Sequence, residues 1–208
     1  MDRVNPSVEQ SIFSIFSIGH SSHKLETFIG LLREYGIQVL VDTRSYPYSK
    51  YAPHFDSSVL KETISNAGMK YLYLGRELGG RPDQLEYYDA SGRVLYGKVA
   101  QTENFLEGIR RLESGLKAFK VAIMCSEENP SACHRRLLVG RVLSMRGVLL
   151  YHIRGNGTLQ TEAELAAQEK NEVGIDSQFV LFSEQKEDQW KSTQSVLQRR
   201  KLQSSSGH

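Results

Sequence analysis

The chain alternates between short runs of consecutive apolar residues and longer stretches with apolar residues at helical spacing. The runs at 39–41 and 121–124 are typical of strands that are covered on both faces of a sheet. The stretch at 25–35 instead places its apolar residues three and four positions apart, which indicates an amphipathic helix. This alternation predicts βα units, in which helices connect parallel strands and pack on the sheet.

The pattern predicts strands at 12–18, 39–42, 71–74, 121–124 and 149–153, and helices at 25–35, 57–67, 104–116 and 132–145. Gly36, Gly68 and Gly147 follow three of these helices at the position of a C-terminal cap. We therefore expect an α/β protein with three layers, a mostly parallel sheet built from βα repeats, and a Rossmann-like arrangement.

The 208 residues are enough for one sizeable core and an appendage. We expect a flexible N-terminus at 1–10, an α/β core domain at 11–157, and a helical extension with a disordered tail at 158–208. No apolar run approaches the roughly 20 residues that span a bilayer, and the first residues lack the pattern of a signal peptide. The sequence predicts a cytoplasmic protein without a membrane partner, and it fixes neither a cofactor nor the oligomeric state.

Both cysteines of the chain lie between residues 125 and 133. Asn129 and Pro130 are typical of a helix start, which predicts that Cys133 lies in the first turn of a helix. The free backbone N–H groups and the helix dipole favour an anion there, and His134 and Arg135 add positive charge. Such a thiol can ionise well below its usual pKa, so Cys133 is a candidate nucleophile.

Cys125 ends an apolar strand, where a cysteine is more typical as a small buried hydrophobic residue than as a reactive group.

Two further strands end in polar residues, one in His20 and the other in Asp42, with Arg44 two positions later. Ligands of open α/β sheets bind beyond the carboxyl ends of the strands, so we expect these groups to meet. Each also has a structural explanation, because His20 can be a hydrogen-bonded structural residue and Asp42 and Arg44 a surface ion pair.

Four ordered motifs, at 17–21, 41–49, 78–80 and 125–135, resemble the bacterial family called domain of unknown function 488, and the resemblance spans about 15–153. It implies an α/β fold but no activity. Thr43 stands where the family pattern more often has valine. The shared site that the resemblance implies consists of His20, Asp42, Arg44, Cys125, Glu127, Cys133, His134 and Arg135.

A weaker similarity, at the level of fold alone, is to rhodanese-like proteins and cysteine phosphatases. Those enzymes hold the nucleophilic cysteine and an arginine on either side of a tight loop. In this chain, Cys125 and Arg135 are ten positions apart, and Cys133 is only two before Arg135. The spacing therefore argues against a direct transfer of their mechanism.

The first functional hypothesis is an enzyme that acts on an anionic small molecule, a nucleotide or a nucleic acid. Cys133 is its nucleophile or redox thiol, His20 or His134 moves the proton, and Arg44 and Arg135 hold the anion. The catalytic candidates are Cys133, His134, His20 and Asp42, and the substrate-binding candidates are Arg44, Ser45, Ser21, Arg135, Glu127 and Cys125.

A second hypothesis is a non-catalytic module that binds nucleotides or nucleic acid, with tyrosines of the long connection at 75–96 stacking on bases or simply packing the loop. The net charge of only +2 gives no global attraction to nucleic acid, so such binding requires a local basic patch.

A third hypothesis is a metal site of Cys125, Cys133, His134 and His20. It ranks last because the cysteine spacing of eight lacks the usual zinc pattern.

Overall fold

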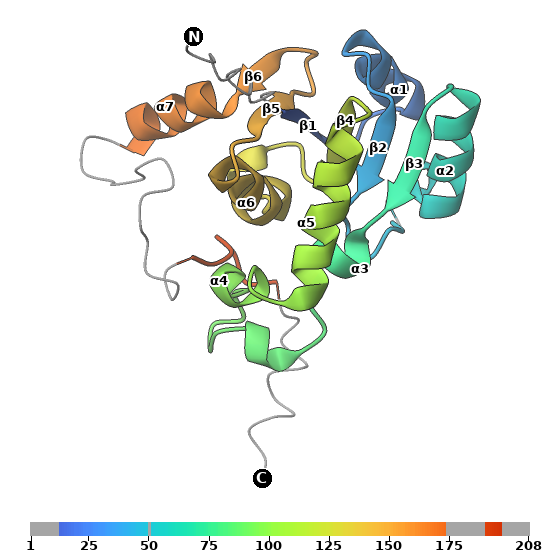
Figure 1. Cartoon of the computed structure of the whole chain (residues 1–208). Helices are drawn as coiled ribbons and strands as arrows, with labels where there is room; N and C mark the ends of the chain where they lie inside the picture. Colours follow the sequence, from blue (N-terminus) through green and yellow to red (C-terminus); the bar gives the residue numbers. More distant parts are fainter. Residues whose placement is uncertain (1–12, 50, 174–189, 197–208) are drawn as a thin grey trace, which may run out of the picture.

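A computed structural model of the chain describes residues 13–49, 51–173 and 190–196 (Figure 1). Its strands form one sheet in the order β3-β2-β4-β1-β5-β6. The first five strands in chain order pair in parallel, and β6 pairs antiparallel with β5. The strands are β1 (Ser14–Gly19), β2 (Val39–Asp42), β3 (Lys70–Tyr73), β4 (Val121–Cys125), β5 (Leu149–Ile153) and β6 (Leu159–Thr161).

Helices cover both faces of this sheet and make three layers (Figure 1). The α-helices are α1 (Leu25–Glu34), α2 (Ser57–Asn66), α3 (Gly75–Leu78), α4 (Tyr96–Val99), α5 (Glu103–Leu116), α6 (Arg141–Met145) and α7 (Glu162–Val173). Short 3-10 turns occur at Pro53–Phe55, Leu85–Tyr87 and Pro130–Ala132, and a π-helical segment at Arg135–Gly140 leads into α6.

Alternate residues of each strand point to opposite faces of the sheet, so the core has two halves. Leu40 of β2 packs in the half that contains Phe28 and Leu32 of α1. Its neighbour Val41 packs in the other half, with Ile109 of α5. Full burial of one such side chain stabilises the fold by about 1.5–3 kcal/mol relative to an exposed one. The three-layer, mostly parallel α/β fold expected from the sequence is confirmed.

The strand order differs from the usual doubly wound order 3-2-1-4-5-6, because β4 lies between β2 and β1. Helix α1 follows β1 and covers one face, whereas the helix that follows β4 covers the other. The chain therefore leaves the two adjacent strands β1 and β4 in opposite directions. The same divergence separates β4 from β2, whose following helix α2 lies on the face of α1, and residues after β2 and β4 line the cavity described below, at the edge where ligands bind in open α/β sheets.

The predicted strands at 39–42 and 149–153 agree with the structure residue for residue, but the predicted helix at 132–145 does not. Asn129 caps only the 3-10 turn, and Cys133 then has an extended backbone with φ −96° and ψ 137°. The Cys133 carbonyl accepts bonds from the backbone N–H groups of Arg136 and Leu137. Cys133 thus precedes the helix, and the expectation that it lies in the first turn is wrong.

The sheet continues past residue 157, because β6 pairs with β5, and α7 supplies the expected helical C-terminal part. Residues 190–196 are not helical, in contrast to the packing helix that the sequence suggested there. Trp190 instead donates from Nε1 to the carbonyl of Leu137 at 2.7 Å. The expectations for 1–10 and for the remainder of the tail lie outside the described residues.

Among the described residues, none of the helices combines the length and the apolar character that a bilayer crossing needs.

Candidate functional site

The carboxyl ends of β2, β4 and β1 lie side by side and bring the predicted polar residues together. Cys125, the last residue of β4, is paired with Gly19 of β1. The backbone N–H of His20 donates to the Cys125 carbonyl at 3.0 Å, and that of Thr43 donates to the Met124 carbonyl at 3.1 Å. The residues after all three strands therefore form one layer at the edge of the sheet.

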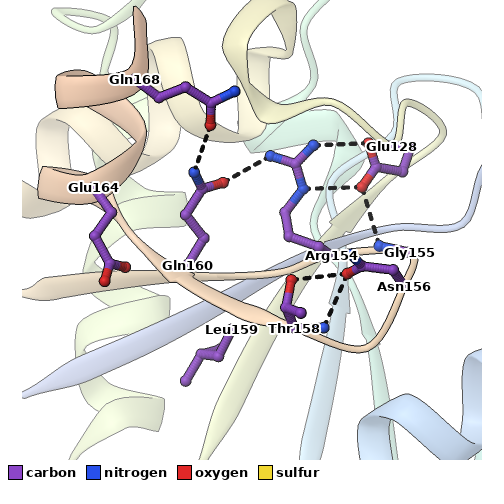
Figure 2. A pocket seen from close by; sticks show the side chains of 9 residues that line it. All are labelled: Glu128, Arg154, Gly155, Asn156, Thr158, Leu159, Gln160, Glu164 and Gln168. Carbon is purple, nitrogen blue, oxygen red and sulfur yellow. Dashed lines mark hydrogen bonds and ion pairs between the residues drawn. The ribbon is translucent and has the colours of Figure 1, made fainter.

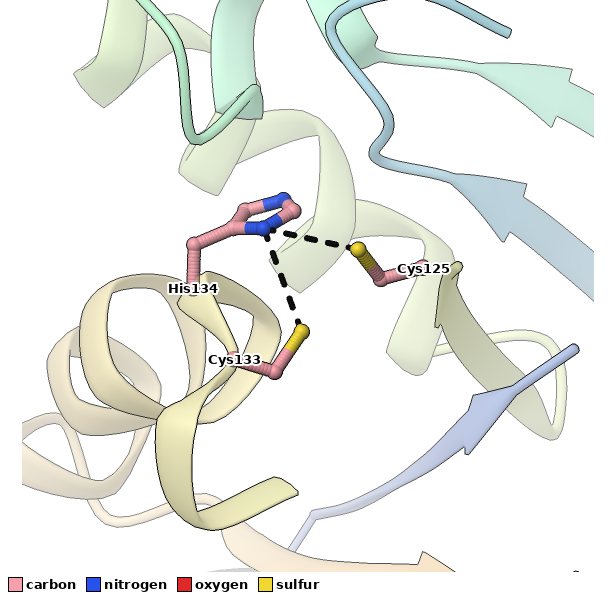
Figure 3. Close-up of side chains that lie close together, drawn as sticks. All are labelled: Cys125, Cys133 and His134. Atoms are coloured by element: carbon pink, nitrogen blue, oxygen red, sulfur yellow. Dashed lines mark hydrogen bonds between the residues drawn. The ribbon is translucent and has the colours of Figure 1, made fainter. Parts of the chain in front are cut away.

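In this layer Cys125, Cys133 and His134 form a compact group, which we call the thiol cluster (Figure 3). The Nδ1 atom of His134 lies 3.6 Å from the Sγ atom of Cys125 and 3.9 Å from that of Cys133. The other ring nitrogen, Nε2, lies 3.0 Å from the Thr43 carbonyl. Because a carbonyl can only accept, Nε2 carries a proton and Nδ1 faces the two sulfur atoms.

The two thiols differ in ionisation. The hydrogen bond from Cys133, followed by the charge of Arg135, outweighs burial and lowers the pKa of Cys125 to about 7. Burial, together with the neighbouring Cys125 thiolate, raises the pKa of Cys133. Burial alone lowers the pKa of His134, but its hydrogen bond to Cys133 outweighs this and raises the pKa overall. The cluster therefore favours one thiolate at Cys125, beside an imidazole that can carry a second proton.

A cavity of about 530 Å³ lies over the thiol cluster. Cys125 and His134 reach its wall, whereas Cys133 is 1% exposed and is not among the residues that line it. The expected nucleophile, Cys133, is thus shielded from a ligand, and the low pKa expected for it belongs to Cys125. Both expectations were wrong because they depended on the predicted helix start at 132, whereas the helical segment of the structure begins at Arg135.

Other predicted residues also line the cavity: Arg44, Ser45 and Glu127. Ser21 does not line it; it adopts a positive φ of 44° and its backbone N–H donates to the Ser126 carbonyl. The sequence analysis missed part of the wall. The 75–96 connection, which was expected near a ligand, supplies Gly80, Arg81, Pro82, Tyr88 and Tyr96 to the wall; the lining residues that were missed are Tyr46, Tyr48, Ser126, Ala132, Ser192, Gln194 and Val196.

Arg44 is held in place by buried polar partners. Asp42 accepts from Nε at 2.9 Å and from Nη2 at 2.6 Å, and the carbonyl of Phe55 accepts from Nη2 at 2.8 Å. Tyr71 donates a further hydrogen bond to Asp42 at 2.7 Å. With one N–H of Nη1 directed at His20, a single N–H of this fixed guanidinium remains for a ligand, and it is presented at little additional entropic cost. Asp42 therefore orients Arg44, and in the described part of the chain it forms no hydrogen bond with a histidine.

His20 supports Arg44 and does not reach the cavity wall. Its Nδ1 donates to the carbonyl of Ser21 at 3.0 Å, and its Nε2 accepts from Nη1 of Arg44 at 3.2 Å. Its ring stacks on Phe55 with centroids 4.3 Å apart. Burial and the Arg44 charge lower the pKa of His20 to about 4. Both ring nitrogens are engaged, so the structure assigns His20 a positioning role and corrects the expectation that it moves a proton.

Arg135 is fully buried and binds the protein's own backbone. Its guanidinium donates to the carbonyls of Glu127 and Glu128, the latter at 2.6 Å. These bonds hold the loop that follows β4, and they occupy the donors that an anion would need. The expectation that Arg135 binds the anion is therefore corrected: it fixes the loop beside Cys125.

Arg81 is the exposed cation of the cavity wall. Its backbone N–H donates to Oγ of Ser45 at 2.9 Å, which fixes the loop. No ion pair joins its guanidinium to any carboxylate within 13–49, 51–173 or 190–196. An arginine without a fixed partner can bind an incoming carboxylate or phosphate through two hydrogen bonds.

Tyr96 contributes a hydroxyl to the same wall. The residue is 2% exposed, yet its side chain lines the cavity. Burial raises the pKa of its phenol, and the nearby Cys133 and Glu127 act in the same direction. The phenol therefore stays protonated and can donate a hydrogen bond to a ligand. Sequence reasoning treated Tyr96 as a packing or stacking residue, since the direction of its hydroxyl depends on the packing of α4.

A second cavity, of about 570 Å³, lies between β6 and α7 (Figure 2). Two of its three charged groups, Arg154 and Glu128, bind each other, and the third, Glu164, accepts from the backbone N–H and the hydroxyl of Thr161. Arg154 pairs with Glu128 at 3.0 Å and donates to Gln160 at 2.8 Å, and Gln160 donates to Gln168 at 3.0 Å. Because these groups are already paired and lie away from both thiols, this cavity is the weaker candidate for a reaction.

Comparison with known proteins gives one match. A family model described as domain of unknown function DUF488 matches residues 24–142. The motif at 17–21 lies outside this range. No curated protein and no solved structure matches the chain.

Proposed function

The chain belongs to the family described as domain of unknown function DUF488, and we propose that it is an enzyme that acts on an anionic substrate through the thiol of Cys125. The observation that carries the proposal is the placement of Cys125 beside Nδ1 of His134 at the wall of a polar cavity. A thiolate next to an imidazolium is the arrangement of an activated cysteine nucleophile.

Two arginines support an anionic substrate. Arg44 lines the cavity and is fixed by Asp42, and Arg81 lies on the neighbouring loop, without an ion pair to a described residue. Charge-assisted hydrogen bonds from guanidinium groups are among the strong polar contacts of proteins. The substrate class is therefore a phosphate-bearing or carboxylate-bearing molecule, with nucleotides and nucleic-acid ends included.

The proposed chemistry has two steps. The Cys125 thiolate donates its electron pair to an electrophilic atom of the substrate, and the leaving group departs with the electrons of the broken bond. The imidazolium of His134 gives its proton to that leaving group. Water or a second substrate then attacks the covalent intermediate while His134 takes a proton, which restores the Cys125 thiolate. A reduced thiol is needed, which favours the cytosol as the compartment.

Alkylation of the chelator-treated protein by iodoacetate and by iodoacetamide tests this proposal. We expect Cys125 to react before Cys133, because only Cys125 lines the cavity. We also expect iodoacetate to outpace iodoacetamide relative to a small free thiol, because its carboxylate can bind the arginines. Peptide mass spectrometry assigns each site, and the ratio of the two rates measures anion recognition.

Arg81→Gln should reduce this ratio roughly tenfold, the effect of losing one charge-assisted contact. Arg93→Gln is the matched control, because Arg93 is also exposed but does not line the cavity. Equal rates at the two cysteines, or no preference for iodoacetate, would contradict the proposal. Salt-dependent phosphate binding without a reactive thiol would favour the non-catalytic binding module instead.

A further inference from the structure

We propose that the thiol cluster binds a zinc ion through Cys125, Cys133 and His134, and that the bound ion masks the Cys125 thiol from reaction. The masking part rests on the proposed function, whereas the metal site rests on the geometry of the cluster alone. The three side chains converge on one point from the end of β4 and from the start of the helix that precedes α6 (Figure 3).

The distances between the donor atoms fit a tetrahedral ion. With zinc–sulfur bonds of about 2.3 Å and zinc–nitrogen bonds of about 2.0 Å, tetrahedral angles place sulfur and nitrogen about 3.5 Å apart. The Nδ1 atom of His134 lies 3.6 Å and 3.9 Å from the two sulfur atoms. All three donor atoms lie within 4.8 Å of one another. Small rotations of the side chains are therefore sufficient to bind the ion.

The second ring nitrogen of His134 is oriented as in metal-binding histidines. Such a histidine usually donates its other N–H to a carboxylate or a backbone carbonyl, which fixes the ring and its tautomer. Here Nε2 lies 3.0 Å from the Thr43 carbonyl and 3.3 Å from the Thr43 hydroxyl. The hydroxyl itself donates to the Met124 carbonyl at 2.8 Å, so its oxygen is free to accept from Nε2. Thr43 thus directs Nδ1 toward the sulfur atoms.

The charges also balance. Two thiolates and a neutral imidazole carry two negative charges, which a Zn²⁺ ion neutralises inside a buried cluster. A mixed set of sulfur and nitrogen ligands suits zinc better than magnesium or calcium, which prefer oxygen.

Three protein ligands leave one position of a tetrahedral ion vacant, which is the arrangement of reactive zinc sites and not of structural ones. Cys125 and His134 reach the cavity wall, so the vacant position faces the cavity. A zinc ion bound there occupies the Cys125 lone pair that would attack a substrate. Zinc would therefore regulate the site by blocking the Cys125 thiolate, and removal of the ion would make this thiolate reactive again.

Titration of the chelator-treated protein with Co²⁺ tests the metal site independently of activity. We expect one equivalent of Co²⁺ to produce a thiolate-to-cobalt charge-transfer absorption and the intense visible bands of tetrahedral cobalt, and equimolar Zn²⁺ to displace both. The Cys133→Ser variant should weaken binding by about tenfold or more, since a ligand is lost. His134→Gln serves as a second variant if Cys133→Ser does not fold. Ser131→Ala is the control, because Ser131 is near the cluster but is not a ligand.

Alkylation of Cys125 in the wild-type protein separates the two proposals. With one equivalent of Zn²⁺, we expect the rate of iodoacetate modification to fall at least about tenfold, and a chelator to restore it. Absence of the cobalt bands, or bands that Cys133→Ser and His134→Gln leave unchanged, would overturn the metal site while leaving the reactive thiol intact. Cobalt bands in a protein whose metal-free thiols are unreactive would overturn the proposed function alone. An alkylation rate unchanged by bound zinc would overturn the masking.

Discussion

At Gly80 the loop after α3 lies directly against the ring of His134, so no side chain fits. A Cβ atom there would lie 2.6 Å from Cγ and 2.8 Å from Nδ1 of that ring. Gly80→Ala should therefore displace His134 from the sulfur atoms and slow the iodoacetate reaction of Cys125. Destabilisation by about 1–3 kcal/mol is typical of such overpacking, and denaturant unfolding measures it.

Gly30→Ala is the matched control for Gly80→Ala. Gly30 lies in α1, and a Cβ atom there would meet nothing within 4 Å. Because alanine favours a helix over glycine, this variant should gain up to about 1 kcal/mol of stability and keep the reactivity of Cys125. Equal reactivity of Gly80→Ala and the wild type would show that the His134 ring position does not control the thiol.

At the scale of the elements, α7 is joined to the helix after β4 by a buried ionic network. Glu162 of α7 pairs with Arg136 at 2.7 Å and accepts from Nε2 of His152 at 3.0 Å, and Nδ1 of His152 lies 2.7 Å from Oγ of Ser17. Glu162→Gln leaves a buried arginine with only Glu169 as a carboxylate partner. We expect a loss of about 3 kcal/mol in unfolding free energy, the lower end of the range for a broken buried pair.

Glu103→Gln is the control for this network, because the ion pair of Glu103 with Arg110 is exposed to solvent and contributes little. Thermal or denaturant unfolding of both variants measures the difference. A Glu162→Gln protein as stable as Glu103→Gln would mean that α7 is held by its apolar contacts, through Leu165 and Ala166, and not by the network.

At the scale of the whole molecule, stability should depend on pH through buried histidines. Burial and the charge of Arg44 lower the pKa of His20 to about 4, against the smaller raising effects of its hydrogen bond to the Ser21 carbonyl and of the Asp42 charge. In the unfolded chain the pKa is about 6.5, so between these values the unfolded state binds more protons and stability falls as the pH falls. The loss attributable to His20 is roughly 3 kcal/mol from pH 6.5 to pH 4.

Urea unfolding at a series of pH values measures this slope. The buried His152, whose pKa is also lowered by burial, acts in the same direction. Hydrogen bonds from His152 and Arg136 hold the pKa of Glu162 below its usual range, and the hydrogen bond from Arg154 does the same for Glu128, so both groups extend the loss as they become protonated at lower pH. His20→Gln cannot protonate and should flatten the slope between pH 6.5 and 4. An unchanged slope in this variant would assign the dependence to the other groups.

The sequence by itself determined the order and type of the main elements and the layer in which the polar residues meet. Local periodicity separates strands from helices, and parallel strands necessarily end at the same edge of a sheet. The placement of Cys125, Asp42 and Arg44 at that edge followed from these two facts alone. The position of β4 between β2 and β1 did not follow, because strand order depends on contacts between distant segments.

Only the tertiary structure decided which polar groups face the cavity. Cys133 and Arg135 flank His134 in the sequence, and this pattern is typical of a nucleophile and an anion-binding residue. Both side chains are nevertheless buried, and Arg135 binds backbone carbonyls. The 190–196 segment carries no local signal that places it at the wall, and the length of the 75–96 connection indicated a nearby ligand without showing which of its residues face the cavity. The direction of a side chain depends on backbone angles at single residues and on the packing of remote elements, and neither leaves a periodic pattern in the sequence.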